Sequence, residues 1–235
     1  MLPILAVLAL LAPQSHAYTF MTSDEGAPLA WQQMPVRFAI NPENPFGLSE
    51  LEVEDAVLLA AEAWEATGAA VEFEYLGFTD TQEVGLDDEN VLFFDDAWQD
   101  DRAKAAITSA WSTSEAEIVS FDVSINALDW EYTVSDEAPV MDLQNVLTHE
   151  FGHVLGLGHS DIDDLATMWA TTSRGDLLRR SLRPDDENAL FANYGMATPM
   201  GLACSTTPGG AGRLGLGWLA GLALVAGAAV SRRRR

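Results

Sequence analysis

Three histidines and a glutamate between residues 149 and 159 have the spacing of a metal site. The stretch reads HEFGHVLGLGH, so that His149, His153 and His159 follow one another at intervals of four and six residues. Residues four apart share one face of a helix, and two imidazoles at that spacing can hold one ion together. Glu150 lies beside the first ligand, where it can act as a base toward water at the metal. Three nitrogen ligands leave a fourth position on zinc open, which is typical of a catalytic site.

The third histidine can reach the same ion only if the helix ends before it. Gly156 provides for this, because glycine accepts a positive φ, ends a helix and lets the chain return His159 to the metal. A bare HExxH could arise by chance, but the added glycine and third histidine make coincidence much rarer. The chain has four histidines, and only His16 lies outside this stretch. Histidines that merely fill an apolar core would not be expected to gather in one motif.

The stretch HEFGHVLGLGHS, followed by DIDDLATMWA, resembles the zinc site of the matrixins, the metzincin branch that contains the matrix metalloproteinases. This resemblance implies one catalytic zinc on the three histidines, with Glu150 as general base. It also implies that Met168 forms an apolar floor under the metal, in a tight turn, and does no chemistry. The family usually has Leu-Met-Tyr-Pro at that turn, so Trp169 and Ala170 depart from it. The segment 183–195 is similar to the last helix of the family.

The remaining pattern predicts an α+β fold, a metzincin-like domain with a twisted mixed sheet, a long active-site helix and a C-terminal helix. Alternating or short apolar runs predict strands at 36–40, 71–76, 91–94, 105–111 and 117–126. A capping box from Ser49 to Glu52 opens a helix that we expect to run to Thr67 and stop at Gly68. Strand, helix and strand give a βαβ start. Asp142 is the expected N-cap of the active-site helix.

The strand expected at 105–111 resembles the edge strand that pairs with extended substrate in matrixins, a β-augmentation mode. An ordinary edge strand is the alternative. Protein or peptide is the expected substrate.

The chain is strongly acidic, with a formal net charge of −24 over 235 residues. Such a charge disfavours nucleic acid and anionic lipid as partners. The acidic residues serve either solubility or calcium binding. The pairs Asp95–Asp96 and Asp100–Asp101 fit a solvated loop and a structural calcium site equally well, and Asp122 and Asp129 lie near the family's calcium ligands. Because no histidine is spare, we expect the second, structural zinc of matrix metalloproteinases to be missing.

Cys204 is the one cysteine in the chain, so an intrachain disulfide is excluded. Matrixin propeptides carry a cysteine that caps the zinc. No cysteine precedes the motif here, so we do not expect that form of latency.

The ends of the chain predict export and attachment. Residues 1–17 read as a signal peptide cleaved after Ala17, and 18–30 as a flexible segment before a catalytic domain at 31–196. A Gly/Pro/Ser/Thr linker at 197–213 precedes an apolar, Arg-ended segment at 214–235, which we interpret as a transmembrane anchor. Cys204, the linker, the anchor and the Arg cluster together resemble a bacterial MYXO-CTERM sorting tag. The resemblance implies sorting machinery as a partner, processing near Cys204 and display at the cell surface. A simple tail anchor is the alternative.

A basic cluster lies between the methionine turn and the last helix, and consists of Arg174, Arg179, Arg180 and Arg183. In the family this segment forms the pocket for the side chain just after the scissile bond. The simpler interpretation is solvated arginines paired with nearby acids. The other is a preference for acidic or bulky polar residues after the cut.

Together these features predict an exported, surface-attached zinc endopeptidase. The first alternative is a zinc-binding pseudoenzyme that acts as a surface adhesion module, although a binding module has no need of Glu150. The second is an anchored structural protein in which the motif is coincidence and no zinc binds.

Overall fold

The computed structural model describes residues 18–136 and 139–197. The expected signal peptide, the anchor and all but the first residue of the linker lie outside the described residues. Within the part that the structure describes, no helix is long and apolar enough to cross a membrane.

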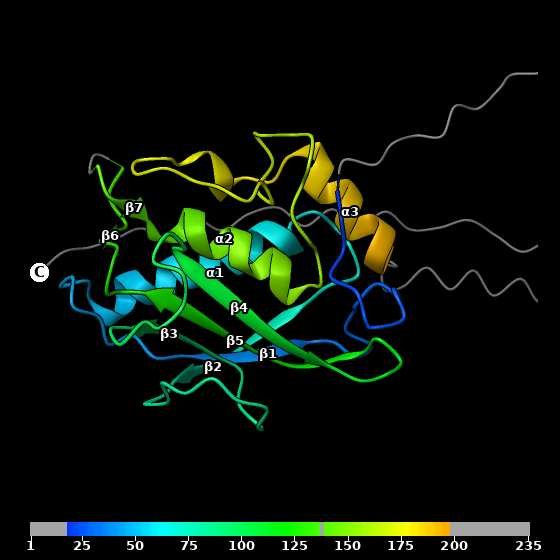
Figure 1. The fold of residues 1–235 in the computed structure, drawn as a ribbon, viewed down its shortest axis with the longest axis horizontal. Coiled ribbons are helices and arrows are strands. Elements are labelled where there is room, and N and C mark those ends of the chain that lie inside the picture. Colours follow the sequence, from blue (N-terminus) through cyan, green and yellow to red (C-terminus); the bar gives the residue numbers. More distant parts are fainter. Residues whose placement is uncertain (1–17, 137–138, 198–235) are drawn as a thin grey trace, which may run out of the picture. The chain divides into compact units, whose positions relative to one another are not determined.

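A five-stranded mixed sheet carries the helices that position the site (Figure 1). Its strands are, in spatial order, β2 (Phe73–Phe78), β1 (Val36–Ile40), β3 (Val91–Asp95), β5 (Ile118–Asn126) and β4 (Ala106–Ser112). Neighbouring strands are parallel except β4, which runs antiparallel to β5 at one edge. A separate two-stranded ribbon pairs β6 (Tyr132–Thr133) with β7 (Met141–Asp142).

Helix α1 (Glu50–Glu65) connects β1 to β2 and supports the helix of the candidate site. Its capping box is complete, with the Glu52 N–H donating to Ser49 Oγ and the Ser49 N–H donating to Glu52 Oε2. Its apolar face is buried. From that face the indole Nε1–H of Trp64 donates to the carbonyl of Thr148 at 2.8 Å. This bond ties α1 to α2 beside the first histidine.

Helix α2 (Leu143–Val154) packs against α1 and against β4. It begins at Asp142, whose Oδ1 accepts a 2.7 Å bond from the Asn145 N–H, as an N-cap should. Leu147 and Phe151 are fully buried. The helix is therefore held on a packed face, which leaves its other face free to present polar groups.

The last described elements are the short η1 (Leu178–Arg180) and α3 (Pro184–Tyr194). In Figure 1, α3 lies beside the segment that begins the described chain. Two bonds join them, because Tyr194 Oη accepts from the Trp31 N–H and Asn193 Nδ2 donates to Leu29 O.

The predicted fold class is confirmed, since the structure is a mixed α/β domain with a five-stranded mixed sheet. Several boundaries were wrong by one or two residues, among them the end of β3, both ends of β4 and the start of β5. The first helix ends at Glu65, with Ala66 as its C-cap, instead of Thr67. Strand β2 begins and ends two residues later than predicted, because the chain needs Gly68 to Glu72 to return from α1 to the sheet. The ribbon of β6 and β7 was not predicted, as two-residue strands have no alternation to detect.

Residues 18–30, for which we predict flexibility, lie against the chain that follows α2. Phe20 forms an antiparallel bridge with Leu157, and Ala30 forms a parallel bridge with Glu117. The Met21 N–H donates to Gly156 O at 2.9 Å. The flexibility itself stays a prediction.

Candidate metal centre

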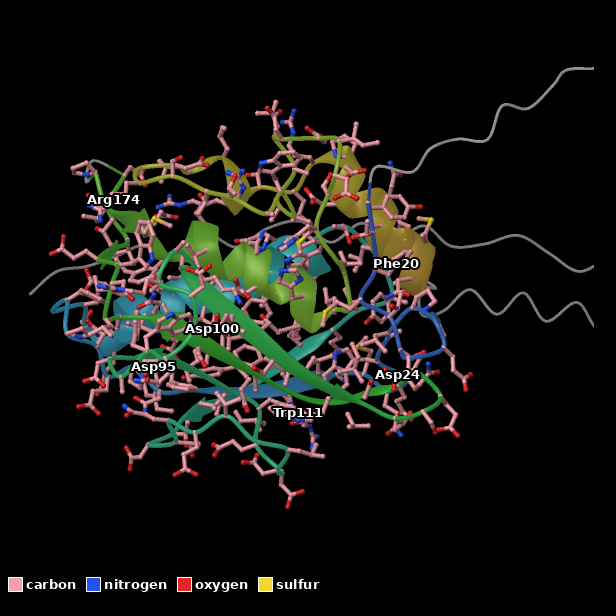
Figure 2. The ribbon with its side chains drawn as sticks, in the orientation of Figure 1. Phe20, Asp24, Asp95, Asp100, Trp111 and Arg174 are labelled. Atoms are coloured by element: carbon pink, nitrogen blue, oxygen red, sulfur yellow. The ribbon has the colours of Figure 1, made fainter. Side chains whose placement is uncertain are left out.

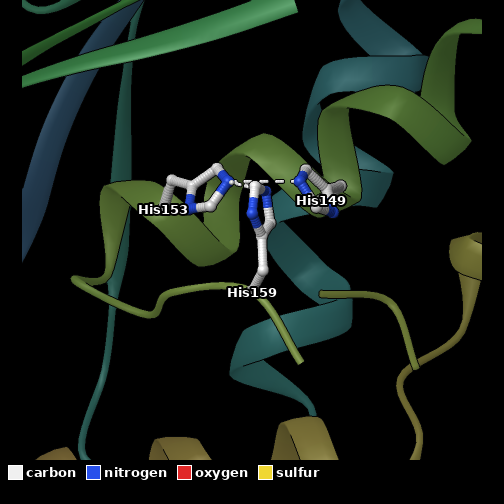
Figure 3. A group of neighbouring side chains, drawn as sticks. All are labelled: His149, His153 and His159. Carbon is white, nitrogen blue, oxygen red and sulfur yellow. Dashed lines mark hydrogen bonds between the residues drawn. The ribbon is translucent and has the colours of Figure 1, made fainter. Parts of the chain in front are cut away.

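The three histidines of the motif meet at their Nε2 atoms (Figure 3). His153 Nε2 lies 3.1 Å from His149 Nε2 and 3.2 Å from His159 Nε2. A tetrahedral zinc ion with Zn–N distances of about 2.0–2.1 Å separates its ligand nitrogens by about 3.3–3.4 Å. The spacing of the rings therefore fits a single ion of that size.

The other ring nitrogens show which atoms are free to bind a cation. His149 Nδ1 lies 2.7 Å from Thr167 O, and His153 Nδ1 lies 2.8 Å from Leu157 O. A carbonyl oxygen only accepts, so both Nδ1 atoms carry the proton and, in the neutral rings, both Nε2 atoms present lone pairs. Two lone pairs 3.1 Å apart cannot bond each other. A cation between them removes the conflict, and carbonyl partners of this kind are usual around metal-binding histidines.

Electrostatics keep two of the rings neutral. Burial lowers the pKa of His149 well below its usual value, and the nearby His153 lowers it further, against the opposing bond to Thr167. Burial and His153 also lower the pKa of His159, while Asp161 opposes that shift. Neutral imidazole is the form that binds a metal.

Glu150 is buried between α2 and the edge strand β4. Only 5% of it is exposed, and its Oε2 accepts a 2.7 Å bond from the hydroxyl of Thr108 on β4. Burial raises the pKa of Glu150, while His153 and the bond from Thr108 act in the opposite direction. The structure thus gives the predicted base a fixed direction and one hydrogen-bond donor.

Gly156 ends α2 in a Schellman motif. The Leu157 N–H donates to Gly152 O at 3.0 Å and the Gly156 N–H donates to His153 O at 2.9 Å, with Gly156 at φ +78°. A Cβ at Gly156 would lie 2.1 Å from Leu29 O. Glycine is therefore required twice, once for the left-handed turn and once for the close approach of residues 18–30.

The loop that carries His159 is fastened by the start of the described chain. The Gly158 N–H donates to Thr19 O at 2.9 Å, and Thr19 Oγ1 donates to His159 O at 2.7 Å. The exposed His159 is thus positioned by a residue 140 places earlier in the sequence.

Met168 lies in a turn that contacts both α2 and the loop that carries His159. Its side chain is buried and packs against α2 at Gly152, where an added Cβ would lie 2.2 Å from the methionine sulfur. The carboxylate of Asp186 on α3 accepts the N–H groups of Thr167 at 2.8 Å and Met168 at 2.9 Å. Met168 O accepts the Ser160 N–H at 2.8 Å. The turn therefore contacts His149 through Thr167 O and contacts Ser160, the neighbour of His159, through Met168 O.

The three histidines and Glu150 line a cavity of about 650 Å³. One wall is the edge strand β4, with Ala106, Ile107 and Thr108, and another is the segment 169–172. An exposed strand edge beside a metal site is suited to an extended peptide, which can add to the sheet by backbone hydrogen bonds.

Comparison with known proteins identifies a family and two relatives. The matrixin (Peptidase_M10) family profile matches residues 30–195, most of the chain. The chain belongs to the matrixin family. The matrixin is similar to metalloendoproteinase 5-MMP of Arabidopsis thaliana, with 45% identity over 56 residues, 24% of this chain and 15% of the relative. It is also similar to neutrophil collagenase of Homo sapiens, with 28% identity over 172 residues, 72% of this chain and 34% of the relative. The chain thus spans about a third or less of the length of these relatives.

The basic cluster of this matrixin separates into arginines with different surroundings. Arg180 pairs with Asp142 and Asp136, as the simpler interpretation expects. Arg174 lies over the ring of Trp130, 5.3 Å from its centroid. Arg179 is only 6% exposed and lines the cavity. It is therefore not a solvated arginine, although it does pair with Asp176.

The acidic residues considered for calcium bond mainly to protein groups in the described chain. Asp95 and Asp100, labelled in Figure 2, accept the N–H groups of Ala97 and Asp101. Asp101 accepts the N–H of Ala103, and Asp122 accepts those of Gly85 and Val91. Asp129 forms an ion pair with Arg102. Calcium binding stays a prediction.

Sequence reasoning missed several residues that hold the site. Thr108 and Asp186 reach the site from distant parts of the chain, and Gly152, within α2, lies against Met168. Gly152 alone had a signal, because a helical glycine between two ligands of one face indicates close approach of another group.

Proposed function

We propose that this matrixin is a zinc-dependent endopeptidase. The observation that carries the proposal is the convergence of three Nε2 atoms at 3.1–3.2 Å, two of them on rings whose Nδ1 protons are held by carbonyls. The family membership supports it, as do relatives named as a metalloendoproteinase and a collagenase.

In this proposal His149, His153 and His159 hold the ion. Bound zinc supplies Lewis acidity, which polarises a peptide carbonyl and lowers the pKa of water. Glu150 takes the proton of the attacking water and passes it to the leaving nitrogen. The Thr108 hydroxyl keeps the Glu150 carboxylate turned toward the cavity. Met168 supports the site from the protein side, where it packs on Gly152 and takes no part in proton transfer.

We also propose that an extended protein or peptide substrate lies along β4. The strand is at the edge of the sheet, so its outer backbone groups face no further strand among the described residues. Pairing there would hold the substrate backbone in a defined register across the three histidines.

Export and surface attachment are part of the proposal and rest on the sequence pattern of residues 1–17 and 197–235. A sorting and processing partner and a structural calcium ion rest on the resemblance to the sorting tag and to the family. Cell fractionation, with amino-terminal sequencing of the mature chain, tests export and surface attachment. We expect the mature chain to begin at Tyr18 and to leave the cytoplasm.

The central experiment measures zinc and cleavage together. Purified wild type, Glu150→Gln and His153→Ala are assayed for bound zinc by mass spectrometry and for cleavage of casein and gelatin. We expect wild type and Glu150→Gln to hold about one zinc each, because Glu150 is not a ligand. Glu150→Gln should lose at least about 100-fold in rate, the usual contribution of a general base. His153→Ala should lose both zinc and activity.

The same assays distinguish the alternatives. A zinc-binding pseudoenzyme acting as an adhesion module would hold zinc in wild type and Glu150→Gln and cleave with neither. A structural protein with a coincidental motif would hold no zinc at all, and that result would end the proposal.

A further inference from the structure

The cavity of the metal site continues past His149 toward a polar end. Asn145 and His149 are four residues apart on α2 and therefore share one face, and both line the cavity. Thr172 and Arg179 line the same end. Asn145 joins them, because its Nδ2 donates to Thr172 Oγ1 at 3.0 Å and its Oδ1 accepts the Arg179 N–H at 2.8 Å.

Arg179 is buried at this end, and its Nε–H is a buried donor without a partner among the described residues. Its Nη1 pairs with the carboxylate of Asp176, and its Nη2 reaches Asp164 O at 3.4 Å. Its Nε is buried and has no hydrogen-bond partner among the described residues. A buried donor without an acceptor is unfavourable, and a guanidinium presents its donors in a rigid plane.

The neighbouring arginine shows that the unused donor is a local feature. Arg180 makes a two-pronged bond to Asp142, through Nε at 2.8 Å and Nη2, and its Nη1 meets Asp136 at 2.8 Å. All three of its nitrogens thus have carboxylate partners. Of the two adjacent arginines, Arg179 lines the cavity, and its Nε has no hydrogen-bond partner among the described residues.

We propose that Arg179 is a specificity-determining residue, and that the cavity beyond His149 takes a substrate side chain with an acceptor oxygen, such as glutamine or glutamate. The inference rests on the proposed peptidase function. The acceptor completes the bonding of Arg179 Nε. Because Asp176 already offsets the guanidinium charge, a neutral amide suffices and a carboxylate is not required. An apolar side chain of the same length leaves the donor unpaired in the complex.

The test uses peptides that differ only in the residue after the scissile bond, with Gln, Glu, Met or Leu at that position. For the zinc-loaded protein we expect kcat/KM for Gln and Glu to exceed that for Met by about 5- to 150-fold, the range for one unpaired buried donor. Arg179→Met should reduce this ratio to about 1, because Met removes the donors and keeps much of the volume. Arg179→Lys should also reduce it, because lysine can still pair with Asp176 but has no Nε–H in that place.

Two further variants guard against simple loss of structure. The double variant Asp176→Asn, Arg179→Met leaves no unpaired acid, and its thermal unfolding temperature and zinc content, compared with those of wild type, report whether the fold and the metal site are intact. Arg183→Met removes an exposed arginine of the same cluster and should keep the Gln preference.

Binding of the same peptides to Glu150→Gln, measured by calorimetry, gives a readout that needs no turnover. A wild type that cuts Met and Leu peptides as well as Gln, with a ratio unchanged in Arg179→Met, would overturn the role of Arg179 and leave the peptidase standing. If no peptide is cut, the peptidase proposal fails. A Gln preference in binding that disappears in Arg179→Met would then still support the polar subsite, and equal binding would overturn it.

Discussion

The helix-borne and loop-borne halves of the candidate metal centre are held in different ways. His149, Glu150 and His153 lie on α2, whose opposite face is buried against α1 and the sheet. Their relative positions follow from the helical repeat. His159 is exposed and lies in a loop that is fixed by backbone and hydroxyl bonds to Thr19. One short motif thus contains a half that depends on local geometry and a half that depends on distant chain.

The two halves meet at the turn of Met168, which Asp186 holds. Thr167 O accepts the Nδ1 proton of His149, and Met168 O accepts the Ser160 N–H next to His159. The carboxylate of Asp186 accepts the N–H groups of both turn residues. Asp186 therefore contacts none of the three histidines, but it reaches His149 through Thr167 and the neighbour of His159 through Met168.

Replacing Asp186 should have the largest effect and should disturb both halves. Asp186→Ala leaves three buried or part-buried N–H groups, those of Thr167, Met168 and Arg183, without their acceptor. Each unpaired buried donor costs about 1–3 kcal/mol, so we expect at least about 3 kcal/mol of lost stability. Thermal unfolding should shift down by about 6–12 °C for a domain of this size. Zinc affinity should fall by at most about 10- to 100-fold, the loss expected for a direct partner of a metal ligand, because Asp186 acts on the histidines only through Thr167 and Met168.

Asp185→Ala is the matched control for that change. Asp185 is adjacent, on the same turn of α3, and accepts the Ser160 hydroxyl at 2.8 Å. Losing that bond should cost about 1 kcal/mol. Equal destabilisation by the two variants would show that the Met168 turn does not depend on Asp186.

The local half was largely predictable and the distant half was not. Ligand spacing, the base beside the first ligand and the glycine at the helix end all follow from neighbours within one or two turns. Alternation likewise placed strands such as β1 at their observed bounds. Asp186 and Thr108 gave no sequence signal, because nothing local says which distant N–H or carboxylate a side chain will meet.

Arg179 and Arg180 illustrate the same limit at close range. They are adjacent and identical in type, yet one is 6% exposed in the cavity wall and the other pairs with the N-cap of α2. The direction of each side chain is set by the short turn of η1. No periodic pattern of hydrophobic residues extends across so short an element, and composition could identify only the cluster as a whole.

Gly156 tests the junction where the helix-borne half passes into the loop. Gly156→Ala places a Cβ 2.1 Å from Leu29 O, a backbone atom that also accepts a bond from Asn193. Gly68→Ala is the control, because Gly68 also has positive φ and also follows a helix, but a Cβ there meets nothing within 4 Å. Each variant carries about 1–2 kcal/mol of left-handed strain. We expect Gly156→Ala to lose about 1–3 kcal/mol more than Gly68→Ala in chemical denaturation, from the overpacking alone.

The two variants should also differ in the position of the loop that carries His159. Displacement of residues 18–30 would release the bonds from Thr19 to Gly158 and His159. Zinc affinity should therefore fall in Gly156→Ala and stay at the wild-type value in Gly68→Ala. Identical zinc affinity in both would mean that the loop keeps its place without the opening segment.

Thr19 gives the smallest and most specific test, because it alters one hydroxyl of the loop-borne half. Thr19→Val keeps the shape and removes the donor to His159 O, while Thr19→Ser keeps the donor. A single hydrogen bond contributes about 0.5–1.5 kcal/mol, so zinc should bind Thr19→Val about 2- to 10-fold more weakly. Competition with a chromophoric chelator measures this, and Thr19→Ser should bind as wild type. Unaltered affinity in Thr19→Val would show that the two backbone contacts of residues 19–21 hold the third ligand without the side chain. The loop-borne half would then depend on strand-like pairing alone, a requirement that many sequences at positions 18–21 could meet.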